Sequence, residues 1–502
     1  MRAVKISLLG VALMAFSFSG FAQDTIRFTW QAGTTKGFII QATNGKSFTV
    51  NWGNGADSTY IGNGNNDIKP RHKYAAAKVY TVTIVASSAD CRFTYLDCTQ
   101  CQLSSLDVRK SLSLTTLHCH ENQLSSLDVS HNTALIVLGC GWNQLSSLNV
   151  SNNTSLTHLV CTSNLLSSLD ISKHTVLKWL DCGGNQLTDL DVSNNMALTD
   201  LSCWGNQLSR LDLTKQTVLT SLSGGNNQLS DLDLSKNTLL TGASLSYNQL
   251  GSLDVSKNTK LEALYCEGNQ LERLDLSKNT ALTNLDCFNN HLPLSDLYVA
   301  SKRISYQYVK RLGPQILMPQ AVEVGDSIDF STQAKFESIA TNFKVEKNGQ
   351  IASQSDYSIN NGVIIFTSIG NYKITMINSA IISNEENPAQ VIVEFSVGGV
   401  GIAETDNYPP LRVYPNPAKN GELTISLPSP PAPKGGDASE GGAYTANNIE
   451  IYSVVGQRLT LKTLTSLETL GSLGKVTIDI SHLASGMYFL KINNQVVKFI
   501  KE

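Results

Sequence analysis

Apolar and polar positions repeat with a period of 21 residues between Phe93 and Val299. In each period, leucines stand two residues before, five after and eight after a position that usually holds cysteine; one period shows them as Leu117, Leu124 and Leu127. One unit of this length cannot bury its leucines alone, so units of fixed period stack and share a core. The pattern therefore predicts a solenoid of about ten coils whose leucines point inward.

The consensus of one period, LxxLxCxxNQLSSLDVSxNTx, is that of a leucine-rich repeat. Its LxC segment predicts a short strand, and alternate side chains of a strand point to opposite sides. Leu117 and Cys119 then face inward, whereas His118 and His120 face outward. Successive strands should form a parallel sheet with about 4.8 Å between neighbours, while the LDVS segment returns along the convex side. We therefore predict a mainly β fold, a solenoid of 21-residue repeats flanked by β-sandwich domains.

Two columns of the repeat are predicted to be structural ladders. The cysteine column points into the core, where a thiol behaves as a small apolar group. The asparagine column lies three residues later, at a turn inside the stack, where its amide can bond to backbone groups that no strand pairs. Leaving such a group unpaired costs about 1–3 kcal/mol. The cysteine ladder comprises Cys98, Cys119, Cys140, Cys161, Cys182, Cys203, Cys266 and Cys287, interrupted by Gly224 and Leu245, and the asparagine ladder comprises Asn122, Asn143, Asn164, Asn185, Asn206, Asn227, Asn248, Asn269 and Asn290.

Ten cysteines in an exported chain would ordinarily indicate disulfides. Stacked thiols would have about 4.8 Å between their Cα atoms, a separation that a disulfide accepts. Their Cα–Cβ bonds run parallel, however, which is poor disulfide geometry, so we expect free buried thiols, with some bridging as the alternative. Cys91, Cys98 and Cys101 differ, because Cys101 takes the asparagine position of the first coil. A Cys91–Cys101 or Cys91–Cys98 bridge that caps the solenoid stays open.

The outward positions of the sheet are free to vary and are therefore the candidate ligand-binding positions. Three of the five tryptophans fall there, and exposed aromatic side chains that the core does not need commonly anchor protein or glycan partners. The alternative is that scattered aromatic residues merely decorate the sheet. A stretch of small residues predicts a shallow depression, made of Ser223, Gly224, Gly225, Ser244 and Ser246. The predicted ligand-binding residues of this concave face are Trp142, Trp179, Trp204, Tyr247, Tyr265, Phe288, His118, His120, His158, Asp181 and Glu267.

Other kinds of chemistry receive little support. Four outward side chains could meet at one zinc ion, namely His118, His120, Glu121 and His158. No ligand spacing repeats, however, and Cys119 points the other way, so we expect no metal and no other cofactor. The sequence contains no HExxH, GxSxG or phosphate-binding loop after a strand, so we expect no enzyme activity. A net charge of -3 gives no electrostatic case for nucleic acid.

The segments before the repeats predict export and a small β domain. Residues 1–22 place Arg2 and Lys5 before an apolar run and end at a small-x-small site, as a secretory signal peptide does. Residues 23–90 contain FTVNWGNG, RHKY and VYTVTI, which resemble the W-x-G-D/N-G, H-x-Y and Y-x-V motifs of polycystic-kidney-disease-type β-sandwiches. Asn54 stands where aspartate is usual, which weakens a calcium argument. We expect this domain to cap the repeat region, residues 91–300.

Two further domains are predicted after the repeats. Residues 301–397 alternate apolar and polar in short runs such as GVIIFTS, which predicts an immunoglobulin-like sandwich, and residues 398–410 predict a linker. Residues 411–502 contain YPNP at Tyr414–Pro417, Gly456, GMY at Gly486–Tyr488 and a basic end at Lys498–Lys501. These motifs resemble the type A C-terminal sorting domain of the type IX secretion system of Bacteroidetes. The resemblance implies export across the outer membrane by that machinery, removal of the domain within the linker, and attachment to surface lipopolysaccharide, or release.

The cysteine-bearing repeat followed by an immunoglobulin-like domain resembles the internalins over residues 93–397, above all the internalin J type with its cysteine ladder. It departs from them at the C-terminus, where the sorting domain stands in place of a wall-anchoring LPxTG signal; internalin homologues of Bacteroidetes such as Porphyromonas fit both halves. The resemblance implies a secreted adhesin at the cell surface or outer membrane, whose concave sheet binds a host or bacterial surface protein or glycan in adhesion or invasion. The alternative is a structural surface protein that self-associates in biofilm. The ligand itself does not carry over from the family.

Overall fold

The computed structural model describes residues 23–501 except for several ranges. The ranges left out are residue 34 and residues 305–308, 318–321, 385–388, 399–411, 415–421, 427–448, 454–457, 460–474, 482, 484–485 and 493–494. Two compact units divide the chain, the first being Met1–Leu292, Val299–Gly313 and Ile382–Pro388 and the second Pro293–Tyr298, Pro314–Ile381 and Ala389–Glu502. The predicted signal peptide 1–22 and most of the predicted linker 398–410 lie outside the described residues.

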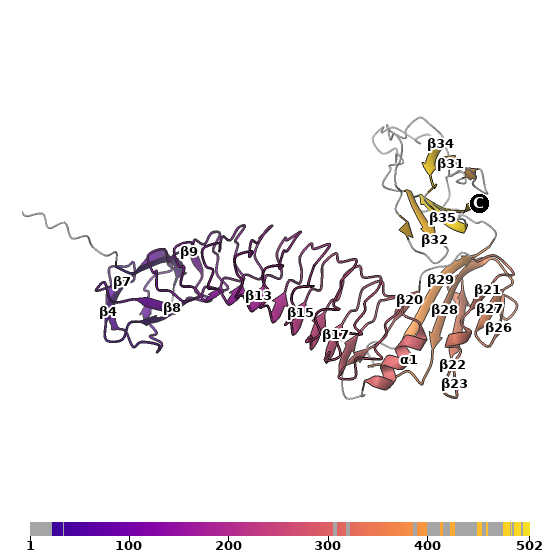
Figure 1. Cartoon of the computed structure of the whole chain (residues 1–502), viewed down its shortest axis with the longest axis horizontal. Coiled ribbons are helices and arrows are strands. Elements are labelled where there is room, and N and C mark those ends of the chain that lie inside the picture. The colour runs from indigo at the N-terminus through magenta and orange to yellow at the C-terminus, as the bar shows by residue number, and fades with distance from the viewer. Residues whose placement is uncertain are drawn as a thin grey trace, which may run out of the picture. The chain divides into compact units, whose positions relative to one another are not determined.

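Short parallel strands stack one per coil in the first unit and form a sheet that runs through the repeats (Figure 1). Each strand pairs with the next at an offset of 21 residues, so that Leu117 lies beside Leu138 and Leu138 beside Leu159. The predicted mainly β fold and 21-residue solenoid are confirmed. The parallel strands of the coils are β8 (Phe93–Asp97), β10 (Thr116–His118), β11 (Val137–Gly139), β12 (His158–Val160), β13 (Trp179–Asp181), β14 (Asp200–Ser202), β15 (Ser221–Ser223), β16 (Gly242–Ser244), β17 (Ala263–Tyr265) and β18 (Asn284–Asp286).

The leucine and cysteine columns form the core of the coils. Leu117 and Cys119 are fully buried, as the alternation of the strand predicts. All ten cysteines are free thiols, so the bridges left open for Cys91, Cys98 and Cys101 do not form. Burial raises the pKa of the ladder thiols, to about 12 for Cys203, which keeps them protonated at neutral pH.

Gly224 and Leu245, the two interruptions of the cysteine ladder, compensate each other. A methyl group on Gly224 would lie 3.5 Å from Cδ2 of Leu245 and 4.0 Å from Sγ of Cys203. Gly224 thus leaves the space into which the longer Leu245 side chain reaches, and Leu245 is fully buried. Gly224 consequently belongs to the core column, and its place in the predicted surface depression is wrong.

The asparagine ladder bonds to backbone groups of two successive coils. The amide nitrogen of Asn122 donates to the carbonyls of Cys98 and Cys119, both at 3.0 Å. Its amide oxygen accepts the N–H of Leu103 at 2.8 Å. The same three bonds recur in each coil up to Asn290, so the turns inside the stack keep no unpaired backbone group at these points.

A second buried ladder lies on the return path, at the asparagine of the xNT segment, and the sequence did not reveal it. Asn132 is fully buried, and its amide nitrogen donates to the carbonyls of Val108 at 2.9 Å and Ser111 at 2.8 Å. His174 and Gln216 take this position in two coils and keep a bond to the preceding coil. The other polar atom of each of these side chains has no partner among the described residues. The ladder comprises Asn132, Asn153, His174, Asn195, Gln216, Asn237, Asn258 and Asn279.

Strands that precede the first coil continue the sheet of the repeats. Strand β3 (Ile39–Ala42) pairs antiparallel with β8 and covers the edge that the first coil would otherwise leave open. The rings of Trp52 and His72 stack 5.1 Å apart, and Tyr74 donates to the Trp52 carbonyl at 2.9 Å, so the W-x-G and H-x-Y motifs meet. The capping role and the family of this domain stay predictions. Its other strands are β1 (Thr25–Ala32), β2 (Thr35–Gly37), β4 (Ser47–Asn51), β5 (Asp57–Ile61), β6 (Arg71–Lys73) and β7 (Lys78–Ala86), and one sheet has the order β5-β4-β7-β1-β9, with β9 (Leu103–Asp107) from the first coil.

The parallel sheet extends beyond the last regular repeat. Helix α1 (Leu294–Arg303) follows β18, and β19 (Lys310–Arg311) then pairs parallel with β18. The buried ammonium of Lys310 donates to the carbonyls of Ser301 at 3.1 Å and Ile304 at 3.0 Å, near the C-terminal end of the helix. Strand β19 therefore lies within residues 301–397, the range predicted for the immunoglobulin-like domain.

The second unit is also built of β-sheets. Two of them have the orders β20-β29-β28-β24-β25 and β21-β27-β26, and two further sheets have the orders β30-β31-β34 and β33-β32-β35-β36. Within the described residues, no helix has the length and apolar character needed to cross a membrane. The elements are β20 (Gln315–Leu317), β21 (Ser327–Asp329), the 3₁₀ helix η1 (Ser331–Gln333), β22 (Lys335–Phe336), β23 (Ile339–Ala340), β24 (Asn342–Lys347), β25 (Gln350–Ile351), β26 (Tyr357–Asn360), β27 (Val363–Phe366), β28 (Gly370–Ile377), β29 (Gln390–Val397), β30 (Arg412–Tyr414), β31 (Glu422–Ser426), β32 (Ile449–Ser453), β33 (Arg458–Leu459), β34 (Lys475–Asp479), β35 (Gly486–Ile492) and β36 (Gln495–Lys501).

Candidate recognition face of the parallel sheet

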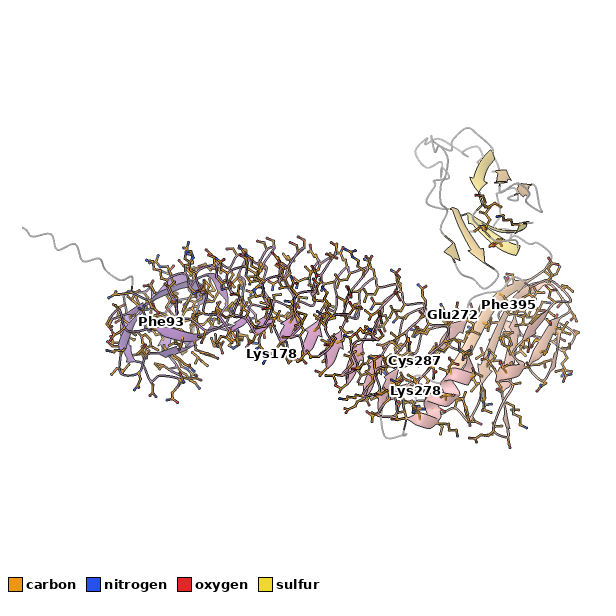
Figure 2. All side chains as sticks on the ribbon, viewed as in Figure 1. Phe93, Lys178, Glu272, Lys278, Cys287 and Phe395 are labelled. Carbon is orange, nitrogen blue, oxygen red and sulfur yellow. The ribbon has the colours of Figure 1, made fainter. Side chains whose placement is uncertain are left out.

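The outward side chains of the stacked strands form one continuous surface, which we call the sheet face. It consists of the residue before each strand, the first and third strand residues, and the second and third residues after the strand. In the coil of β10 these are Thr115, Thr116, His118, His120 and Glu121, and the register repeats the set every 21 residues. Side chains cover every coil, and Lys178, just before β13, is one member of this face (Figure 2).

The three tryptophans predicted for this surface are exposed on it. Their exposed fractions are 58% for Trp142, 44% for Trp179 and 38% for Trp204. Tyr247 is 50% exposed, and the Trp179 ring stacks on His158 with 6.4 Å between ring centres. Rings that keep this much exposed surface contribute little to the core and are available to a partner.

Glycines about one repeat away make room for several of these rings. A methyl group on Gly183 would lie 2.3 Å from Nε1 of Trp204, and one on Gly268 would lie 2.6 Å from the Tyr247 ring. Such distances are too short for real contacts, so the position of each ring depends on the glycine beside it. The sequence analysis missed these pairs, although the 21-residue register places each glycine directly next to its ring.

The last column of the sheet face has a left-handed backbone in every coil, with φ between 51° and 67°. Glycine adopts this conformation without strain and asparagine at small cost. Glycine or asparagine at half of these positions was a readable signal of the conformation, and the sequence analysis missed it. The column comprises Gln100, Glu121, Trp142, Ser163, Gly184, Gly205, Asn226, Tyr247, Gly268 and Asn289.

The histidines do not converge on one point. The rings of His118 and His120 stack with 5.8 Å between centres, and Nδ1 of His120 accepts the N–H of Gly141 at 3.2 Å. Burial, with a smaller contribution from His118, lowers the pKa of His120, so this ring is neutral at physiological pH. His158 instead stacks on Trp179. Among the described residues, no group of three or more His, Cys, Asp or Glu side chains has the arrangement of a metal site.

Carboxylates of the sheet face are held mostly by neutral donors. Asp181 accepts the N–H of Gly183 at 3.2 Å and the hydroxyl of Ser202 at 2.8 Å. One oxygen of Glu267, Oε2, is shielded from solvent and has no hydrogen-bond partner in the described part of the chain. Tyr265 and Glu267 are both half-buried outward residues of the same coil.

Two sequence-based assignments near the C-terminal end of this face need correction. Asp286 occupies an outward position of the repeat but is fully buried, because Arg311 of β19 forms an ion pair with it. The guanidinium of Arg311 also lies 5.6 Å from the centre of the Phe288 ring. Ser246, predicted to line the depression, is buried as well. The outer surface at that point is therefore left to Ser223, Ser244 and their neighbours.

The C-terminal region of the chain matches a known domain family. Residues 412–502 match the model of the secretion system C-terminal sorting domain. The sorting domain predicted from the YPNP, GMY and basic-end motifs is therefore present. Comparison with curated protein sequences finds no match.

Several solved structures of leucine-rich-repeat proteins resemble this chain. The functional domain of InlJ from Listeria monocytogenes, described as including a cysteine ladder, is 26% identical over 61% of this chain and 81% of that one, with a TM-score of 0.34. An internalin, inlF, from the same species is 21% identical over 45% of this chain and 80% of that one, with a TM-score of 0.33. The leucine-rich-repeat protein LIC12759 of Leptospira interrogans is 20% identical over 44% and 75%, with a TM-score of 0.31.

Proposed function

We propose that this chain is a cell-surface adhesin that binds a protein or glycan partner through the sheet face, in adhesion to host cells or their invasion. The match of residues 412–502 to a sorting domain indicates secretion and attachment to the cell surface. A solenoid of leucine-rich repeats presents a long exposed sheet to a partner. The exposed rings of Trp142, Trp179 and Trp204 supply the kind of anchor that dominates recognition surfaces.

The observation that carries this proposal is the left-handed backbone of Trp142 and Tyr247, each with φ of 55°. Bulky L-residues in this conformation cost about 1–2 kcal/mol, whereas glycine, present at the same position as Gly184 and Gly205, avoids that cost. Both aromatic side chains are at least half exposed, so burial does not compensate for the strain. Strain of this kind clusters where a side chain serves a function.

A test follows from replacing these residues with the glycine that the backbone prefers. In the Trp142→Gly/Tyr247→Gly variant we expect unchanged or slightly higher stability, because relief of strain offsets the entropy of glycine in the unfolded chain. Adhesion of beads coated with the protein to host cells should fall by about tenfold or more, since aromatic anchors contribute about 2 kcal/mol each. Ser163→Gly is the matched control, since Ser163 has the same backbone conformation and a small side chain.

Adhesion unchanged by the double substitution would contradict the proposal, provided that the variant unfolds at the same temperature as the parent. The same beads mixed without cells report on self-association. Aggregation that depends on Trp142 and Tyr247, together with no binding to cells, would favour the structural biofilm protein instead.

A further inference from the structure

Negative charge is concentrated on the sheet face of the coils. Between Phe93 and Leu292 this face carries seven carboxylates, and its cations are Lys178 and the adjoining Arg311. The other positions of the same coils carry eleven carboxylates and ten lysines or arginines, which nearly balance. The net charge is thus about −5 on the sheet face and about −1 over the remaining positions. The seven carboxylates are Asp97, Glu121, Asp181, Asp200, Glu262, Glu267 and Asp286.

Most of these carboxylates have no cation of their own. Among the described residues, Asp286 is the one member of the seven that forms an ion pair, with Arg311. Glu121 accepts the side-chain amide of Gln100 at 2.7 Å, and Asp200 accepts the hydroxyl of Thr199 at 2.7 Å. Like charges on one face of a sheet repel one another, so this face becomes more stable when positive charge is supplied from outside.

Glu267 shows most directly that a positive group is missing. Its Oε2 is shielded from solvent without a partner, and a buried oxygen in that state costs free energy that a bound donor would recover. Tyr247 lies one coil before Glu267 and Phe288 one coil after it, so rings stand on both neighbouring coils. Aromatic rings beside a carboxylate favour ammonium and guanidinium groups through cation–π attraction and ion pairing.

The chain itself provides one example of a cation held on this surface. The guanidinium of Arg311 lies 5.6 Å from the Phe288 ring centre and pairs with Asp286. Glu267 and Tyr247 offer the same combination of carboxylate and ring, with no cation of this chain paired to Glu267 among the described residues.

We propose that the sheet face binds a protein through lysine and arginine side chains, so that the partner is a basic protein surface and not a glycan. This inference rests on the proposed adhesin function and specifies the chemistry of its partner. An acidic face repels anionic carbohydrate, whereas complementary charge accelerates association with a basic protein and gives it specificity.

The test uses the purified chain and three fluorescent peptides of equal length, rich in lysine and arginine, in glutamate, and in glutamine. We expect binding of the basic peptide alone, weakening as salt rises towards about 0.15 M and beyond. The sheet-face variant Asp200→Asn/Glu262→Gln/Glu267→Gln should lose about tenfold or more in affinity. The matched variant Asp189→Asn/Asp231→Asn/Glu272→Gln removes three exposed carboxylates from other positions and should bind as the parent does.

Equal affinities of the two triple variants, or failure of the parent chain to prefer the basic peptide, would overturn the proposal. Cell adhesion measured in parallel separates this failure from that of the adhesin function. Adhesion that depends on Trp142 and Tyr247 but ignores both salt and the sheet-face carboxylates would leave an adhesin whose partner is not basic. Adhesion indifferent to all of these substitutions would remove the adhesin function itself.

Discussion

At the scale of single residues, the coils depend on side chains that take the place of missing backbone partners. The amide nitrogen of Asn185 donates to the carbonyls of Cys161 at 3.1 Å and Cys182 at 3.0 Å, and its oxygen accepts the N–H of Leu166 at 3.0 Å. All of these groups are buried, so water cannot replace the amide. One side chain therefore stabilises two successive coils.

Replacement of Asn185 by alanine should lower the free energy of unfolding by about 2–4 kcal/mol, because several buried backbone groups lose their partner. Asn194→Ala is the matched control, since Asn194 is exposed and makes a single bond to the carbonyl of Ser172. Its cost should stay below about 1 kcal/mol. Urea unfolding of both variants measures the difference, and equal costs would show that the ladder contributes no more than a surface amide.

Residue-scale features were predictable where the repeat fixed them. The inward cysteines and the first asparagine ladder follow from register, because a residue every 21 positions keeps one environment. The second ladder at Asn132 escaped notice because Asn152 and Asn153 stand side by side, and nothing in the sequence says which one is buried. Asp286 was misplaced because Arg311, which covers it, belongs to a strand outside the repeat.

At the scale of a structural element, the cysteine ladder tolerates an interruption because two neighbouring coils change together. Gly224→Cys alone should crowd Leu245, and Leu245→Cys alone should leave a cavity, each lowering stability by about 1–3 kcal/mol. The double variant restores the regular column and should recover most of that loss. A coupling energy of about 1 kcal/mol or more in the double-mutant cycle is the expected result, and strictly additive costs would contradict it.

The ladder also makes the pH dependence of stability predictable. Burial raises the pKa of thiols such as Cys119 and Cys140 above the value they have in the unfolded chain. The folded chain therefore keeps protons that the unfolded chain releases, and stability is undiminished below about pH 8.5 and falls above it. Each such thiol contributes a loss of up to about 1.4 kcal/mol per pH unit.

Urea unfolding with a reductant, measured from neutral to alkaline pH, tests this expectation. A variant with Cys119→Ala, Cys140→Ala and Cys161→Ala is less stable at neutral pH but should lose stability less steeply as the pH rises. Parallel pH profiles for this variant and the parent would show that other groups, such as Tyr74 with its pKa of about 12, cause the alkaline loss.

At the scale of the whole molecule, the sequence predicted a secreted repeat protein with a sorting domain more fully than it predicted the limits of its parts. The sorting motifs are local, and the family match over residues 412–502 agrees with them. The end of the repeat sheet was harder to predict, because β19 joins it through backbone pairing without any repeat motif. The charge asymmetry of the sheet face was present in the sequence but becomes visible once the register assigns each residue to a face.

The central claim is that the sheet face is a recognition surface, and the most direct test removes its tryptophans. We expect the Trp142→Ala/Trp179→Ala/Trp204→Ala chain to fold and to lose about tenfold or more of its binding to cells, measured with protein-coated beads. The matched chain Leu112→Ala/Val176→Ala/Met196→Ala removes three exposed apolar side chains outside the sheet face and should bind as the parent does. Equal binding by the tryptophan variant and the parent would contradict the claim.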